Sequence, residues 1–178
     1  MNTGKSDIAN KIFFAVVFTV MFFLSGVIGI GMRVSDSTNF VRADLLFALS
    51  AVTGILYDNR CSAAIIALVF GVISDIFLTP PIHLSPILFF LSAYYISKLA
   101  GAFTNVNAVT AAVSSIPFFL ARSVVGCIYT LSGNDEAGLW YVIKNITLPE
   151  LAFNITAVFF VYIVVNFIYK RIKRRFYI

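Results

Sequence analysis

The stretch that decides the fold is Ala64-Ile-Ile-Ala-Leu-Val-Phe-Gly-Val-Ile-Ser-Asp-Ile-Phe-Leu78, an apolar run that holds one carboxylate, Asp75. An ionisable group at membrane depth is costly, and it is kept where it has a partner, a water-filled cavity or a function. Small residues recur along the run at three- or four-residue spacing, namely Ala64, Ala67, Gly71 and Ser74. The run therefore predicts a membrane-spanning helix with a helix-contact face, and Asp75 follows that face in sequence.

The composition of the whole chain agrees with a membrane environment. Of 178 residues, 60% are hydrophobic and 12% are charged, and the mean hydropathy is +0.95. Soluble domains are about half apolar and about one quarter charged. Because each span takes about 20 residues, the chain has room for a single membrane domain, residues 1–178, and for no soluble domain.

Apolar runs interrupted by glycine, proline and charged residues predict an all-α integral membrane protein with six transmembrane helices. The predicted helices are 12–32, 43–57, 62–78, 84–99, 106–131 and 148–169. Tyr57-Asp58-Asn59-Arg60 is expected to be a tight polar connector, and Thr79-Pro80-Pro81 a turn, since proline opposes helix continuation. Between Ser132 and Ile146, the adjacent Trp140 and Tyr141 favour a short segment along the headgroups.

Lysine and arginine set the predicted orientation. With six spans both termini share one side, and that side collects Lys5, Lys11, Arg60, Lys98, Lys170, Arg171, Lys173, Arg174 and Arg175. The opposite side has only Arg33, Arg42 and Lys144. Basic loops face the cytoplasm, so the sequence predicts a multi-pass membrane protein with both termini cytoplasmic.

The C-terminal basic cluster has two interpretations. It comprises Lys170, Arg171, Lys173, Arg174 and Arg175. The first is a generic anchor on anionic lipid headgroups, worth about 1 kcal/mol per basic residue near the surface. The second is a docking peptide for a cytoplasmic partner. Binding of nucleic acid is not expected, because the cluster belongs to the end of a helix.

On this topology the remaining charges gather in the outer half of the bundle. The candidate outer-cavity cluster is Asp44, Asp75, Arg122, Glu150 and His83. Arg122 lies nine residues before Leu131, about 13 Å from the outer end of its helix. One arginine among three carboxylates predicts a buried polar network.

The roles within this cluster differ. Asp75 and Arg122 are expected to form a coupled pair, either functional or architectural. Asp44 and Glu150 also fit positions at helix starts, where the macrodipole favours a carboxylate. No catalytic or metal-binding signature is present, and the single histidine, His83, excludes a multi-histidine metal site. The sequence therefore predicts a protein without enzymatic activity, catalytic residues or cofactor, and an intramembrane enzyme is the weakest alternative.

The order of these polar positions resembles the rod shape-determining protein MreD family. The resemblance rests on Ala43-Asp44-Leu-Leu-Phe-Ala-Leu, on Gly71-Val-Ile-Ser-Asp75-Ile-Phe, and on Pro149 and Asn154 in the last helix. It covers roughly residues 41–175. Two positions depart from the family: Ala43 stands where the family has proline, and Ile82-His83 where it often has Leu-Gly.

The resemblance implies a non-enzymatic scaffold of the cell-elongation machinery that maintains rod shape and peptidoglycan synthesis. Its partners would be MreC and, through MreC, the MreB filament and the RodA–penicillin-binding protein synthase. The family's fold is similar to the six-helix substrate-binding subunit of energy-coupling-factor vitamin transporters, and such a subunit is the alternative function. Against that alternative, Ala15 is followed four residues later by Thr19 rather than by the second alanine of a coupling motif.

Overall fold

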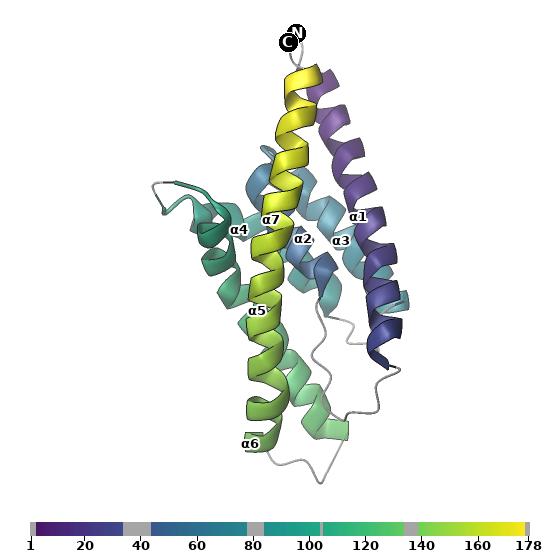
Figure 1. The fold of residues 1–178 in the computed structure, drawn as a ribbon, viewed down its shortest axis with the longest axis vertical. Helices are drawn as coiled ribbons and strands as arrows, with labels where there is room; N and C mark the ends of the chain where they lie inside the picture. The colour runs from purple at the N-terminus through teal and green to yellow at the C-terminus, as the bar shows by residue number, and fades with distance from the viewer. Residues whose placement is uncertain (1–2, 34–43, 78–83, 104, 134–138, 177–178) are drawn as a thin grey trace.

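The computed structural model describes residues 3–33, 44–77, 84–103, 105–133 and 139–176, and all regular structure in these ranges is helical (Figure 1). The elements are α1 (Thr3–Arg33), α2 (Leu45–Leu56), α3 (Arg60–Phe77), α4 (Ser85–Ala100), α5 (Ala108–Gly133), α6 (Leu139–Val142), the π-helical turn η1 (Ile143–Thr147) and α7 (Leu148–Phe176). The predicted all-α class is confirmed, and α1 to α5 and α7 correspond to the six predicted apolar runs.

The outermost helices are longer than predicted. α1 begins at Thr3 rather than at residue 12, and α7 continues to Phe176 rather than ending at 169. Hydropathy marks where the apolar run ends, whereas the helix itself continues outward through lysine and arginine, which are good helix formers. The predicted Thr79-Pro80-Pro81 turn lies outside the described residues.

Among the described residues, four helices are long and apolar enough to cross a membrane, which makes the chain a multi-pass membrane protein. Their apolar windows are Ile8–Ser25, Arg60–Phe77, Ala108–Ile128 and Glu150–Lys173. At about 1.5 Å per residue, the 12 residues of α2 span about 18 Å, and the 16 residues of α4 about 24 Å. Both are shorter than the hydrocarbon core of about 30 Å, so helix length alone supports four of the six predicted spans.

α2 is the centre of the bundle. It packs against α1, α3, α4, α5 and α7, and every residue from Leu46 to Gly54 is buried. A helix that is apolar all round is either enclosed by protein or faces lipid, and the burial of Leu46 to Gly54 shows that α2 is enclosed. In Figure 1, α2 accordingly lies among the longer helices.

Ring contacts fix the relative direction of α1 and α3. Phe18 stacks on Phe70 with ring centroids 4.7 Å apart, and further along both helices Phe22 meets Phe77 at 6.0 Å. Residue numbers rise together on both helices, so α1 and α3 are parallel. The chain must therefore reverse between them, and α2 is the described helix that intervenes.

Contacts with α7 fix the direction of α2. Asp44, at the start of α2, bonds to Asn154 near the start of α7. At the other end, Phe14 contacts both Tyr57 and Tyr169. α2 and α7 are therefore parallel to each other. The same aromatic contacts place the start of α1 beside the end of α7, as Figure 1 shows.

α5 runs opposite to α7. Tyr162 donates to the Val106 carbonyl at 3.3 Å, just before α5 begins. At the other level, Arg122 of α5 and Asn154 of α7 both bind Asp44. Residue numbers fall along α5 as they rise along α7, so α5 and α7 are antiparallel.

The small-residue face predicted on α3 is confirmed. Ala64, Ala67, Gly71 and Ser74 are all buried, and the closest packing is with α4. A Cβ on Gly71 would lie only 2.8 Å from Pro86 Cα. α2 approaches α4 even more closely, because a Cβ on Gly54 would lie 2.3 Å from the Ala93 carbonyl oxygen. Glycine at both positions lets the helix backbones approach each other.

Candidate functional site

The charged centre of the bundle is an ion pair between Asp44 and Arg122. Asp44 is the N-cap of α2, and its Oδ1 accepts a hydrogen bond from the Phe47 backbone N–H at 2.9 Å. Its second oxygen, Oδ2, pairs with Nη2 of Arg122 on α5. Each side chain retains only 14% exposure. One carboxylate thus caps α2 and neutralises the arginine at the same time.

Asn154 joins α7 to this pair. Its side-chain oxygen accepts the backbone N–H of Asp44 at 2.7 Å, and the residue is 2% exposed. That N–H precedes the first turn of α2 and has no partner within the helix itself. Asp44, Arg122 and Asn154 therefore form one polar node, which links α2, α5 and α7.

Two buried aromatic rings cover the arginine. The Arg122 Cζ lies 5.2 Å from the centroid of the Phe47 ring and 5.9 Å from that of Phe89. Both rings are completely buried and meet edge to face at 5.2 Å. Cation–π contacts of this kind contribute about 2 kcal/mol when they are desolvated. Arg122 is thus held both by the Asp44 carboxylate and by ring faces from α2 and α4.

The polar node lies within the apolar part of the bundle. Arg122 precedes Ile128, the end of the apolar window of α5, by six residues or about 9 Å. Asn154 follows Glu150, the start of the window of α7, by four residues or about 6 Å. Asp44 was predicted at the outer end of its helix. It lies deeper in the bundle than the ends of α5 and α7, because α2 is shorter than these two helices.

The structure gives Arg122 a partner other than the predicted Asp75. Arg122 pairs with Asp44, whereas Asp75 is on α3, which packs against α1, α2 and α4 and, within the described residues, makes no close backbone approach to α5. The expected Asp75–Arg122 pair was based on both residues being in the outer half. Shared depth was not sufficient, since α2 and α4 both pack between α3 and α5.

The other cluster members take separate positions. The helix-start interpretation of Asp44 is confirmed by its cap hydrogen bond. Glu150 lies in the first turn of α7, as expected of a helix-start carboxylate, one turn before Asn154. His83 lies outside the described residues. The structure thus brings Asp44 and Arg122 of the predicted cluster into contact.

Three residues of this site were not predicted as members of it. Asn154 was noted only as a position of resemblance, and Phe47 and Phe89 appeared as ordinary apolar residues. A polar amide inside the apolar run of α7 was the available signal for Asn154. The described residues contain no group of three or more His, Cys, Asp or Glu that could hold a metal ion.

The basic end of α7 makes weaker contacts. Lys173 Nζ lies 3.6 Å from Oδ2 of Asp58, and both side chains are well exposed. Lys173 also lies over the Tyr169 ring at 5.6 Å, and Arg171 over the Phe167 ring at 5.0 Å. The side chains of Arg174 and Arg175 lie outside the described part of the chain.

Comparisons with models of protein families, with curated proteins and with solved structures found no match. A proposal for the function of this chain is therefore based on its own features, which are the polar node and the basic end of α7.

Proposed function

We propose that this chain is a non-enzymatic membrane scaffold of the cell-elongation machinery, of the MreD type. The observation that carries the proposal is that Asp44 and Asn154, two of the positions of resemblance, bind each other in the polar node. A third, Gly71, lies where α3 packs closely against α4. Residues that fix helices to one another suit a subunit whose task is to present a rigid surface to other proteins.

The partner in this proposal is MreC, and through it the MreB filament and the RodA–penicillin-binding protein synthase. In that arrangement the chain maintains rod shape by holding the synthesis machinery in the bacterial cytoplasmic membrane. The resemblance in sequence supports this assignment. The structure contributes a bundle whose charged groups Asp44 and Arg122 are engaged with each other.

The proposal includes six membrane crossings. α1 and α3 are parallel, so if both cross the bilayer, the chain must return between them, and α2 is the described segment that does so. By the same argument α4 returns the chain between α3 and α5. Short helices are tolerated inside a bundle because neighbouring helices shield their ends from lipid.

We further propose that both termini are cytoplasmic. The start of α1 and the end of α7 lie at one end of the bundle, where Phe14 contacts Tyr169. Basic residues gather at that end, and the positive-inside rule assigns it to the cytoplasm.

Affinity purification from detergent-solubilised membranes tests the function. MreC is expected to be retained on the tagged chain, and depletion of the chain is expected to round rod-shaped cells. Recovery of an energising ATPase module and a bound vitamin, without MreC, would overturn the proposal in favour of the transporter subunit. The neighbouring genes give an independent check, since shape genes support one function and transporter ATPase genes the other.

The transporter alternative has less support from the site. A small polar ligand in the outer half would need charged groups that face a cavity. Arg122, one of the two residues expected at the centre of such a site with Asp75, instead binds Asp44. Its guanidinium is covered by Phe47 and Phe89.

A further inference from the structure

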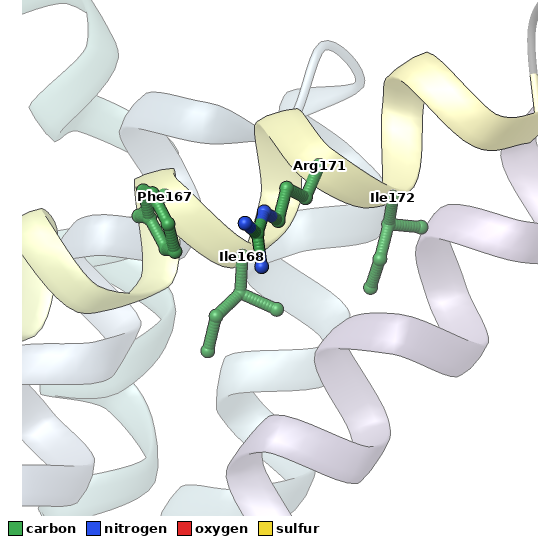
Figure 2. A pocket seen from close by; sticks show the side chains of 4 residues that line it. All are labelled: Phe167, Ile168, Arg171 and Ile172. Carbon is green, nitrogen blue, oxygen red and sulfur yellow. The ribbon is translucent and has the colours of Figure 1, made fainter.

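A shallow groove lies along the last turns of α7, at the end opposite to the polar node. It has a volume of about 260 Å³ and is lined by Phe167, Ile168, Arg171 and Ile172 (Figure 2). Phe167 is 60% exposed, and Ile168 is also exposed. Residues four apart share one face of a helix, so the lining is one continuous strip. Figure 2 shows the Arg171 side chain lying along this strip and pointing back towards Phe167.

Arg171 supplies the charged group of this groove. Its Cζ lies 5.0 Å from the centroid of the Phe167 ring, and its side chain is exposed. Among the described residues it makes no ion pair, whereas the nearby Lys173 pairs with Asp58. The guanidinium therefore retains its hydrogen-bond donors for an anion from outside the chain.

The groove lies at the depth where a lipid headgroup meets its acyl chains. The apolar window of α7 ends at Lys173, so Phe167 and Ile168 belong to its last apolar turns and Arg171 to the boundary. Basic residues surround this level: Lys170 and Lys173 are on α7, and Lys11 is on α1 one turn before Phe14, which contacts Tyr169.

We propose that this groove is a specific site for an anionic glycerophospholipid. Phe167, Ile168 and Ile172 hold a segment of one acyl chain, and Arg171 binds the headgroup phosphate. A guanidinium binds phosphate through two parallel hydrogen bonds, which an ammonium group cannot do. At about 260 Å³, the groove is smaller than the pockets of about 300–1,000 Å³ that hold drug-sized ligands, and it suits part of a flexible chain.

This site differs from a general attraction of the tail to anionic headgroups. General attraction distributes the affinity evenly over all basic residues near the surface. A specific site instead makes Arg171 contribute more to lipid affinity than its neighbour Lys170, although both side chains carry the same charge. The inference does not depend on the scaffold function.

Lipid binding to the purified full-length chain tests the headgroup contact. Native mass spectrometry in detergent is used to follow titration with phosphatidylglycerol, and phosphatidylcholine serves as the neutral reference. Arg171→Gln is expected to weaken phosphatidylglycerol binding about tenfold, which corresponds to about 1.4 kcal/mol, and Lys170→Gln to weaken it less than about twofold. Equal losses in the two variants would overturn the site and leave only general attraction.

A second pair of variants tests the acyl-chain contact with every charge intact. Ile168→Trp fills the groove and is expected to release the bound phosphatidylglycerol. Ile163→Trp, at an exposed apolar position of the same helix, is expected to leave binding unchanged. Inorganic phosphate at millimolar concentration should not displace the lipid if the acyl chain contributes. Displacement by phosphate, or unchanged lipid binding in Ile168→Trp, would reject the groove as a lipid site.

Discussion

Asn154 Oδ1 accepts the backbone N–H of Asp44 at 2.7 Å, although 110 residues of chain separate them. The last helix thus satisfies the backbone at the start of the second helix. Because the Asn154 side chain binds a main-chain group of α2, it fixes both the depth and the rotation of α2 relative to α7. Asp44 in turn holds Arg122, so one residue sets the relative position of three helices.

Asp44 and Arg122 should be energetically coupled. Arg122→Gln leaves a carboxylate without its cation inside the bundle and should lower the free energy of unfolding by about 3 kcal/mol. A double-mutant cycle with Asp44→Asn, measured by unfolding in mixed micelles, should give an interaction energy of about 0.5–3 kcal/mol.

Two control cycles accompany this measurement. Asp75→Asn combined with Arg122→Gln should be additive, because Arg122 pairs with Asp44 instead. The exposed pair Asp58 and Lys173 should show a coupling of at most about 1 kcal/mol. A larger coupling of Arg122 to Asp75 than to Asp44 would contradict the polar node.

Asn154→Ala should remove the acceptor of the Asp44 N–H. The loss of a buried hydrogen bond with an unsatisfied donor costs about 1–3 kcal/mol. Asn166→Ala, on the same helix twelve residues later, provides the matched control and should change the free energy of unfolding by less than about 0.5 kcal/mol. Equal effects of the two substitutions would remove the special role of Asn154.

The sequence predicted the elements better than their contacts. Apolar runs located α1 to α5 and α7, and small residues from Ala64 to Ser74 located the face of α3 that packs on α4. Each is a local pattern, since hydropathy and residue size repeat along one helix. The partner of Arg122 depends on how three helices are arranged around one another. A pattern within one stretch of sequence does not specify that arrangement.

Depth in the bundle does not identify the partner of Arg122. Topology placed Asp44, Asp75 and Arg122 in one half of the bundle, and that left each carboxylate as a candidate partner for Arg122. The positions of α2 and α4, which both pack between α3 and α5, decided between them. The central position of α2 is evident from the burial of every residue from Leu46 to Gly54. The apolar run 43–57 alone did not distinguish an enclosed helix from a lipid-facing one.

Gly54→Ala should destabilise the protein, whereas Gly126→Ala should not. A Cβ on Gly54 would lie 2.3 Å from the Ala93 carbonyl oxygen, and a Cβ on Gly126 would meet no atom within 4 Å. Overpacking of this kind costs about 1–3 kcal/mol. At Gly126, alanine should stabilise the helix by about 0.5–1 kcal/mol. Thermal unfolding in detergent measures both, and a stable Gly54→Ala variant would contradict the close approach of α2 and α4.

Ser50 and Ser92 should be weakly coupled. Their hydroxyl oxygens are 2.7 Å apart between α2 and α4, and each is also within bonding distance of a backbone carbonyl three residues earlier. Each hydroxyl has one proton, so only one of them donates to the other while its partner bonds to the backbone. Hydrogen bonds between membrane helices average about 0.6 kcal/mol. A double-mutant cycle of serine-to-alanine substitutions should give a value near this, and a coupling above about 2 kcal/mol would indicate a different bond pattern.

Labelling of cysteine tests the proposed orientation. Cys61 is exposed in the first turn of α3, at the end of the bundle where α7 finishes. In a Cys127→Ala background, a membrane-impermeant maleimide should label Cys61 in inside-out vesicles and leave it unlabelled in intact spheroplasts. Labelling in spheroplasts alone would reverse the orientation.

The enclosed position of α2 has a consequence for biogenesis. During translation the N-terminal helices leave the ribosome first, and α2 then has neither Arg122 nor Asn154 to bind Asp44. The first helices must therefore wait in a partly assembled state until α5 and α7 have been inserted. A truncation before α7 would leave the start of α2 without the Asn154 acceptor, so quality-control proteases should recognise such fragments even though most of the spans are present.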